Sequence, residues 1–322
     1  MKEIKINKND AGQRLDRFIG KAVPLLPDSL TQKYIRLKRI KLNGKGAKRD
    51  TRLAEGDVLQ LYINDEFFEK PKESNSWLKV GNPRLDIVYE DENILLCDKK
   101  PGVLCHSAGQ WDWNTLIANI QAYLAAKGEW KPKEENSFTP ALCNRIDRNT
   151  GGIVIAAKNA EALRILNDKI RDREIEKYYL CVVKGRPKPA EGRLENQLFK
   201  DADKNQVYVK DRPGPGTKTA VTEYKVLCSK GPLSLVECRL LTGRTHQIRV
   251  QMAHAGWPLV GDGKYGRESI NKNYDEKGQA LYSYRLRFDF PTDAGILEYL
   301  RGKEFKVTKV DFAEKYFGIT EL

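Results

Sequence analysis

A short polar segment near the middle of the chain places one carboxylate between two cations. Residues 144–152 read NRIDRNTGG, so that Asp147 lies between Arg145 and Arg148 just before an apolar stretch. Neighbouring guanidinium groups favour the ionised form of a carboxylate, which suits it to act as a nucleophile or a base and makes it a poor general acid. A structural salt bridge at a loop would give the same pattern. Asp147 is therefore a candidate catalytic residue, and the segment alone fits both interpretations.

A second segment, residues 242–250, combines a turn with the start of a helix. It reads TGRTHQIRV, and the residues that follow repeat at helical spacing until Gly256. We expect the side chains of Arg244, His246 and Gln247 to be exposed around the helix start, where backbone N–H groups and side-chain donors can bind a phosphate. Helix capping combined with surface charge is the alternative explanation.

Composition excludes several classes of protein. The chain has 322 residues, 40% of them apolar, with no apolar run of the length that a membrane span or a signal peptide needs. We therefore expect a cytosolic protein without a membrane partner. Its six cysteines are scattered and its three histidines form no ligand pattern, so that buried free thiols and no metal site are predicted. No nucleotide-binding loop is present, and no cofactor is expected.

The charge of the chain points to a polyanionic partner. The formal net charge is +13, and residues 11–63 hold twelve Lys or Arg and five Asp or Glu, a net charge of +7. Surface lysines and arginines gain free energy by displacing counterions from phosphates, so that nucleic acid is favoured over a membrane surface as the partner. A solvated basic face without a partner is the alternative for this concentrated amino-terminal charge.

The amino-terminal module, residues 1–64, has the pattern of a small mixed domain. Leu15, Phe18 and Ile19 predict a helix, a second helix is expected from Asp28 or Ser29, and small strands follow at residues 38–42 and 58–63. Its order and basic charge resemble the RNA-binding domain of ribosomal protein S-four. That resemblance implies RNA contacts by Arg14, Lys33, Arg36, Lys38, Arg39, Lys41 and Asn43.

The rest of the chain is predicted to be a larger domain, residues 84–322, after a polar linker at residues 65–83. Strands are expected at 85–89, 94–99, 152–157, 178–183, 220–227 and 233–241, and helices from about 114 and 160. Strands predominate and do not alternate regularly with helices. The predicted fold class is therefore α+β, with a mixed, mostly antiparallel sheet.

Several motifs in this order resemble the RluA-type RNA pseudouridine synthases. The most specific are the Asp147 loop with the strand after it, residues 177–185 (KYYLCVVKG), and residues 244–250 continuing to 258–262 (PLVGD). The resemblance covers most of residues 85–315. It implies a monomeric enzyme that converts uridine to pseudouridine without cofactor or metal, in 23S ribosomal RNA or, as the second choice, in transfer RNA.

The resemblance also assigns roles to single residues. Asp147 acts on the sugar and base, as nucleophile or base, and Arg244 pairs with it. Tyr179 stacks on the uracil and helps to remove the proton from carbon 5. Arg145 fills the space that the flipped nucleotide leaves. Further substrate or phosphate contacts are expected from Arg148, Lys158, His246 and Gln247.

Two positions depart from the family pattern. Asn144 stands where His usually begins the catalytic motif, and Gly151 stands where Ser is common. Neither touches Asp147 in the motif, so that activity is expected to survive, although Asn144 suggests an altered substrate contact.

Two other classes of function fit parts of the pattern. An RNA-binding assembly factor would use the basic module and would not need Asp147. A hydrolase of glycosidic bonds normally needs a pair of carboxylates, and the matched motifs contain one. Release of free uracil would indicate the hydrolase, conversion of uridine without release would indicate the synthase, and neither product would indicate the assembly factor.

Overall fold

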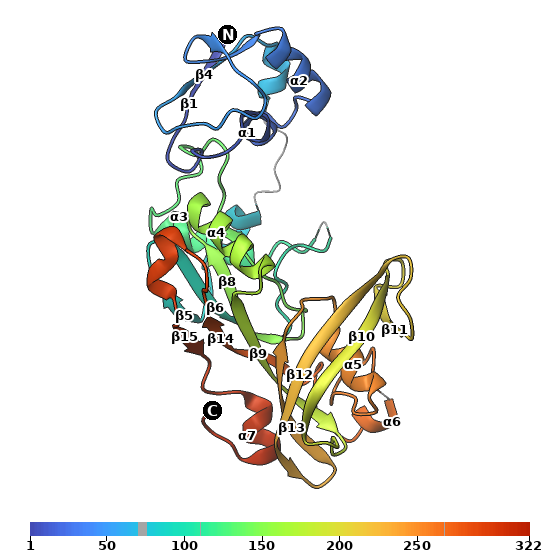
Figure 1. The fold of residues 1–322 in the computed structure, drawn as a ribbon. Coiled ribbons are helices and arrows are strands. Elements are labelled where there is room, and N and C mark those ends of the chain that lie inside the picture. Colours follow the sequence, from blue (N-terminus) through green and yellow to red (C-terminus); the bar gives the residue numbers. More distant parts are fainter. Residues whose placement is uncertain (70–75, 110, 267) are drawn as a thin grey trace.

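The computed structural model describes residues 1–69, 76–109, 111–266 and 268–322. Its first part is a small sheet with two helices, at the top of Figure 1. The elements are β1 (Lys2–Lys5), α1 (Leu15–Ala22), α2 (Asp28–Arg36), β2 (Ile40–Leu42), β3 (Lys45–Gly46) and β4 (Val58–Leu61). The antiparallel strands lie in the order β1-β4-β2-β3.

The first helix and the Asn43–Gly44 turn of this module form where the sequence predicts them. Leu15, Phe18 and Ile19 of α1 are fully buried in a cluster with residues of the small sheet. Asn43 and Gly44 have φ angles of 51° and 77°, and this left-handed turn reverses the chain between β2 and β3. The module therefore has a hydrophobic cluster of its own.

The segment 65–83 contains two 3₁₀ turns, η1 (Asp65–Phe68) and η2 (Ser76–Lys79). Phe67 and Phe68 pack against the hydrophobic cluster of the module. Trp77 packs edge-on against Trp130, with ring centroids 5.3 Å apart. Aromatic residues thus attach both ends of the predicted linker to the structure, and residues 70–75 lie outside the described part.

Polar groups join the module to the larger part of the chain. The buried carboxylate of Asp10 accepts hydrogen bonds from Ser137 Oγ (2.5 Å) and Asn136 Nδ2 (2.7 Å). Asn9 Oδ1 accepts one from the backbone N–H of Ala160 (3.1 Å), at the start of helix α4 (Ala160–Arg171). The module therefore contacts the larger part directly, and not only through residues 65–83.

The larger part is built around an extended sheet. Its strands are β5 (Ile87–Glu90), β6 (Ile94–Lys99), β7 (Ala141–Leu142), β8 (Gly151–Ala157), β9 (Ile175–Lys184), β10 (Glu191–Asp201), β11 (Gln206–Lys210), β12 (Thr217–Lys230), β13 (Leu233–Leu240), β14 (Leu281–Phe288) and β15 (Glu304–Lys306). The helices besides α4 are α3 (Leu116–Ala126), α5 (Gln247–His254), α6 (Glu268–Asn271), η3 (Gly295–Leu300) and α7 (Asp311–Phe317).

In the described residues this sheet has 11 strands, with the main order β11-β10-β12-β13-β9-β14-β8-β6-β5. Its neighbours are antiparallel except for β14 and β8, which pair in parallel through Tyr282 with Gly151 and Ser283 with Gly152. The predicted α+β class with a mixed, mostly antiparallel sheet is confirmed. β10, β11, β14, β15 and α7 were not among the predicted elements.

Helices cover both faces of the sheet (Figure 1). At β6 and β8, α3 packs on one face and α4 with η3 on the other. At β9 and β13, α5 packs on one face and α7 on the other. Ile146 belongs to the contacts of both the α3 cluster and the α5 cluster, so that the Asp147 loop lies where these two clusters meet.

Two local predictions need correction. The helix expected from about residue 114 begins at Leu116, and it is capped by Thr115, whose side chain accepts a hydrogen bond from Ala118 N. The predicted strands 178–183 and 220–227 are longer than expected, because neighbouring strands continue their hydrogen-bond ladders to residues 175–184 and 217–230. None of the described helices is long and apolar enough to span a membrane.

The junction at Asp10 gives a test of how firmly the module is attached. In Asp10→Ala the half-buried amide of Asn136 and hydroxyl of Ser137 lose the carboxylate that accepts their hydrogen bonds, and a hydrogen bond to a charged group contributes about 1.5–3 kcal/mol. The midpoint of urea unfolding should therefore fall. Asp50→Ala, which removes an exposed carboxylate of the same module, is the control and should unfold like wild type. Equal midpoints for the two variants would contradict the junction.

Candidate functional site

Most of the residues that the sequence singles out surround one pocket. The pocket lies between the Asp147 loop, strand β9 and the start of α5. It is lined by Arg145, Ile146, Asp147, Thr150, Tyr179, Leu240, Arg244, His246, Gln247, Ile248, Arg249 and Leu281. Segments about 100 residues apart in the sequence therefore meet at a single carboxylate.

A buried guanidinium holds that carboxylate. Arg249 donates from Nη1 to Asp147 Oδ2 at 2.9 Å. Its Nε and Nη2 donate to the two oxygens of Asp262 at 2.7 and 2.9 Å. The side chain of Arg249 is 8% exposed, that of Asp262 is fully buried and that of Asp147 is 29% exposed. Asp262 thus fixes the plane of the guanidinium, and Asp147 is the partner that reaches solvent.

The pKa values follow from this arrangement. Burial alone would disfavour both charges, but the hydrogen bonds and charge of Arg249 outweigh it and hold the pKa of Asp262 below its ordinary value. The two carboxylates likewise outweigh burial at Arg249 and raise the pKa of its guanidinium. Both groups therefore stay ionised at neutral pH, and Asp147 always faces a cation.

The other oxygen of Asp147 faces the pocket. Nε2 of His246 lies 3.8 Å from Asp147 Oδ1. Burial lowers the pKa of His246 and outweighs the opposing effect of the Asp147 charge, so that the imidazole is neutral at pH 7. Burial raises the pKa of Tyr179 to about 12. Tyr179 is therefore a neutral phenol on the wall of the pocket, 6% exposed.

A buried lysine holds the Asp147 loop in place through a hydrogen bond to the loop backbone. Lys99, at the end of β6, is 1% exposed and donates hydrogen bonds to the backbone oxygens of Lys100, Val103 and Arg148. Burial lowers the pKa of Lys99 to about 8. The backbone N–H of Gly102 donates to the same oxygen of Arg148 at 2.9 Å. The loop carbonyl that follows Asp147 is thereby fixed to the end of a central strand.

The two departures from the family pattern have structural explanations. A Cβ atom on Gly151 would lie 2.2 Å from the ring of Tyr282, so that this chain has no room for the common Ser. Asn144 Oδ1 accepts a hydrogen bond from the backbone N–H of Ile155 at 2.8 Å. Its side chain is thus used to attach the loop to β8, and the expected altered substrate contact stays a prediction.

Several expected contacts are corrected by the geometry. Arg244 lines the pocket but donates from Nε to the backbone oxygen of Thr219 at 3.1 Å, and Arg249 takes its expected place beside Asp147. Arg244 precedes α5, whereas Arg249 lies in the first turn of that helix and its side chain reaches the Asp147 loop. Arg148 is exposed, with its Nη2 3.8 Å from Asp112 Oδ1, and lies outside the pocket lining.

Three further side chains, which were expected to be exposed or to contact a phosphate, are largely buried. The side chain of His246 is 9% exposed. Gln247 is 3% exposed, because its amide accepts from Thr242 Oγ1 and donates to Val221 O and Thr222 Oγ1, which fixes the turn before α5. Lys158 was expected to contact a phosphate. Its side chain is 7% exposed and pairs with Glu90 and Glu129.

On the module, three of the basic residues line one groove. Lys33, Arg36 and Lys38 surround a hollow of about 730 Å³ between α2 and residues 46–49. Lys48 and Arg49 extend the same positive edge. This groove is the largest basic hollow among the described pockets.

The other four module residues have partners of their own. Arg39 and Lys41 lie over aromatic rings of the module, 5.5 and 5.3 Å from the centroids. Arg14 forms an ion pair with Asp16 at 2.6 Å. Asn43 accepts from Val58 N and donates to Asp57, so that its side chain closes the turn after β2.

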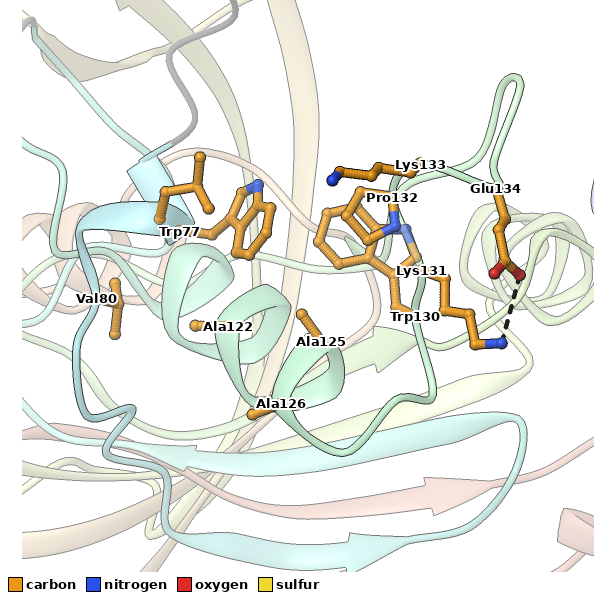
Figure 2. A pocket seen from close by; sticks show the side chains of 11 residues that line it. Trp77, Val80, Ala122, Ala125, Ala126, Trp130, Lys131, Pro132, Lys133 and Glu134 are labelled. Carbon is orange, nitrogen blue, oxygen red and sulfur yellow. Dashed lines mark ion pairs between the residues drawn. The ribbon is translucent and has the colours of Figure 1, made fainter.

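A pocket with mostly apolar lining lies elsewhere in the fold. Figure 2 shows it beside α3, where Trp77 and Trp130 lie above Ala122 and Ala125. Its volume is about 550 Å³, and its charged side chains are two lysines and Glu134. These three side chains are exposed, and Lys131 pairs with Glu134, whereas a buried cation holds Asp147. The pocket at Asp147 is therefore the candidate active site.

No cluster of possible metal ligands occurs in the part of the chain that the structure describes. The six cysteines are free, and four of them are buried. The thiols of Cys181 and Cys238 lie 3.9 Å apart beneath Tyr179.

Comparisons with known proteins identify relatives of the chain. A model of the family RNA pseudouridylate synthase matches residues 93–254. An uncharacterised RNA pseudouridine synthase of Mycoplasma genitalium is 33% identical over 288 residues, which are 88% of each chain. The ribosomal large subunit pseudouridine synthase C of Vibrio cholerae is 31% identical over 301 residues, 92% of this chain and 91% of that one.

The fold is also similar to a solved structure. Human RNA pseudouridylate synthase domain containing 1 aligns with a TM-score of 0.56 and 22% identity. The alignment covers 74% of this chain and 89% of the human one. The fold of the larger part therefore has a counterpart among known structures.

Sequence reasoning missed four residues of the site. Lys99, Arg249, Asp262 and Tyr265 have no assigned role in the sequence analysis, although Arg249 and Asp262 lie inside segments that it quotes. The ion pair between Arg249 and Asp147 spans 102 positions. The usable signal was the helical periodicity after residue 246, which places Arg249 among buried residues, where a charge needs a partner.

Arg249→Met tests the shared ion pair. The variant leaves the fully buried Asp262 and the partly buried Asp147 without their cation, and breaking a buried pair in this way costs roughly 3–5 kcal/mol. The expected result is a clear fall in the free energy of unfolding, measured by chemical denaturation. Arg244→Met is the matched control, since its guanidinium is exposed, and should stay within about 0.5 kcal/mol of wild type. The opposite ranking would restore Arg244 as the partner.

Proposed function

Because the chain belongs to the RNA pseudouridylate synthase family, we propose that it isomerises specific uridines of 23S ribosomal RNA and that Asp147 is the essential group. The choice of RNA is supported by the Vibrio cholerae relative, which is named for the ribosomal large subunit. The basic amino-terminal module supports a large structured RNA as the substrate.

One observation carries the assignment of Asp147. Its Oδ2 is bound by Arg249, while Oδ1 faces the pocket and is free of a hydrogen bond to the described residues. An ionised carboxylate with one oxygen fixed and the other presented to a cavity is ready to act on a bound sugar or base. The geometry suits both a nucleophile and a base.

The reaction is an isomerisation in which all atoms are conserved. The bond from ribose C1′ to uracil N1 breaks, the base turns within the pocket, and C1′ bonds to C5. The proton that leaves C5 is balanced by the proton that N1 gains. In the nucleophilic route Asp147 stabilises C1′ or bonds to it as N1 leaves, and it is released when C5 bonds to C1′. In the alternative route Asp147 removes a sugar proton as N1 leaves and returns it when C1′ bonds to C5.

The remaining pocket residues have positioning roles in this proposal. Tyr179 stacks on the uracil, and its raised pKa keeps it a neutral phenol, so that stacking is its main role and removal of the C5 proton a weaker expectation. Arg145 is exposed at the mouth of the pocket, where it can fill the space that a flipped nucleotide leaves. Arg244 lines the pocket, and Arg148 follows Asp147 in the chain with an exposed side chain, so that we keep both as contacts to RNA phosphates.

We assign phosphate binding on the module to the groove of Lys33, Arg36 and Lys38. These three side chains are exposed, and they line one hollow. Residues 1–64 then act as an RNA-binding domain that resembles the one in ribosomal protein S-four, and residues 84–322 as the catalytic domain. Asn43 and Arg14 take part through the fold of this surface, since their side chains are bound within the module.

Asp147→Asn tests the catalytic assignment. The variant keeps the shape of the side chain and removes its charge, so that turnover should fall at least about 10³-fold while affinity for RNA stays nearly unchanged. Tritium release from 23S transcript labelled at uracil C5 measures turnover, and mapping of pseudouridine identifies the product. Asp168→Asn, at an exposed position of α4, is the control. Substantial turnover by Asp147→Asn would exclude Asp147 as the essential group.

The same assay separates the alternative functions. Free uracil in the products would indicate a glycosidic hydrolase. RNA binding by wild type without conversion of uridine would indicate an assembly factor.

A triple variant tests the groove of the module. Replacing Lys33, Arg36 and Lys38 by Ala should weaken binding to a long structured RNA and flatten the plot of log affinity against log salt concentration. Each lost phosphate contact lowers that slope by about 0.7–0.9. Replacing the exposed Lys230, Lys303 and Lys309 by Ala removes the same charge from the other part of the chain and is the control. Equal slopes for the two triple variants would mean that the groove does not bind phosphates.

A further inference from the structure

The start of helix α5 has an unusual backbone at a residue that faces Asp147. His246 has a φ angle of 52° and a ψ angle of 23°, a left-handed conformation that is uncommon for residues other than glycine. Such strained residues persist only where the surrounding structure holds them. The conformation directs the imidazole toward two partners, one at each ring nitrogen.

The first partner is a tyrosine from outside α5. Nδ1 of His246 and the hydroxyl oxygen of Tyr265 lie 2.8 Å apart. The same hydroxyl oxygen accepts a hydrogen bond from the backbone N–H of Val207, at 2.9 Å, at the start of strand β11. Because a backbone N–H can only donate, it uses an acceptor site of the hydroxyl and leaves the hydroxyl hydrogen free to be donated.

Nδ1 of His246 is the acceptor that this hydrogen reaches. If Nδ1 carried the proton instead, the Tyr265 oxygen would accept two hydrogen bonds and its own hydrogen would have no acceptor among the described contacts of this hydroxyl. The second partner supports the same conclusion. Nε2 lies 3.8 Å from Asp147 Oδ1, and a bare lone pair there would face the negative carboxylate.

We propose that Tyr265 fixes His246 as the neutral tautomer with the proton on Nε2, and that His246 thereby presents an N–H donor to the free oxygen of Asp147. Tyr265 is a positioning residue that acts through His246. The inference deepens the proposed function and rests on Asp147 being the reacting group. It holds for Asp147 as nucleophile and as base.

The lowered pKa of His246 agrees with a neutral donor. A neutral N–H at Nε2 faces the Asp147 carboxylate without adding a second full positive charge beside it. The ring of Tyr265 also lies 5.2 Å from the Arg249 guanidinium, and 5.5 Å from the imidazole in an edge contact. Tyr265 therefore contacts both side chains that face Asp147.

The tautomer can be measured directly in the free protein. A long-range ¹H–¹⁵N correlation spectrum distinguishes a protonated from a bare ring nitrogen, and the chain has only three histidines. His106→Gln and His254→Gln, both at exposed positions, assign the signals by elimination. The expected spectrum of His246 at pH 7.5 is that of the Nε2–H form. The Nδ1–H form or an imidazolium would overturn the proposal, and this result depends on no variant of the site.

Tyr265→Phe tests the role of the hydroxyl. The variant keeps the ring and should convert the His246 spectrum into an average of two tautomers. Turnover should fall about tenfold with KM nearly unchanged, because the donor is lost at Asp147 and not at the surface that binds RNA. Tyr123 lies on α3, and its hydroxyl donates to the Glu90 carboxylate. Tyr123→Phe is the control for loss of one phenol hydrogen bond. It should change neither the His246 spectrum nor turnover.

Two outcomes would overturn this role. An unchanged His246 spectrum in Tyr265→Phe would show that the hydroxyl does not set the tautomer. A mixed tautomer with wild-type turnover would show that the donor does not matter for Asp147. Both results are distinct from failure of the proposed function, which would appear as wild-type protein that forms no pseudouridine while its tautomer is as expected.

Discussion

The buried guanidinium of Arg249 is the interaction on which the site depends. One cation serves two carboxylates, and the fully buried Asp262 takes two of its hydrogen bonds and sets its plane. Backbone N–H groups of Lys264 and Tyr265 also donate to Asp262, which fixes the acceptor in turn. Because Nε and Nη2 of Arg249 are held by Asp262, the planar guanidinium directs its Nη1 to Asp147. A lysine could not replace this arrangement, because its ammonium lacks the planar fork that binds both carboxylates at once.

The sheet supplies the rigidity that such a network requires. The Asp147 loop enters β8, a strand in which all residues are buried, and Gly151 and Gly152 let β14 approach as a parallel neighbour. A Cβ on Gly152 would lie 2.2 Å from the backbone of Ser283. The close approach therefore depends on glycine at this position, and it places the loop at the end of two central strands. Lys99, at the end of the neighbouring strand β6, donates a hydrogen bond to the backbone oxygen of Arg148 in the same loop.

Local patterns in the sequence predicted what depends on neighbours in the chain. The helices at 15–22, 28–36, 116–126 and 160–171, and the turn at Asn43, follow from spacing that a short window contains, and the last two helices also have side-chain caps, Thr115 and Asn159. Strand β14 was missed because its position between β9 and β8 depends on pairing with residues about 100 or more positions away. The partner of Asp147 was missed for the same reason. Spacing placed two arginines in one segment, and only the packing of α5 decides which of them is buried.

A buried carboxylate organises the junction of the module, as another one organises the site. Asp10, Asn9 and Gln13 bind polar groups of the segment 135–137 and the first turn of α4, so that a buried carboxylate again organises a junction. Helix α4 packs against β8, the strand that begins directly after the Asp147 loop. An RNA held in the groove of the module would therefore be placed relative to Asp147 through the polar junction at Asp10 and the packing of α4 on β8. On the proposed function, this gives the module a role in selecting the uridine as well as in affinity, because the distance from groove to pocket is set by the fold.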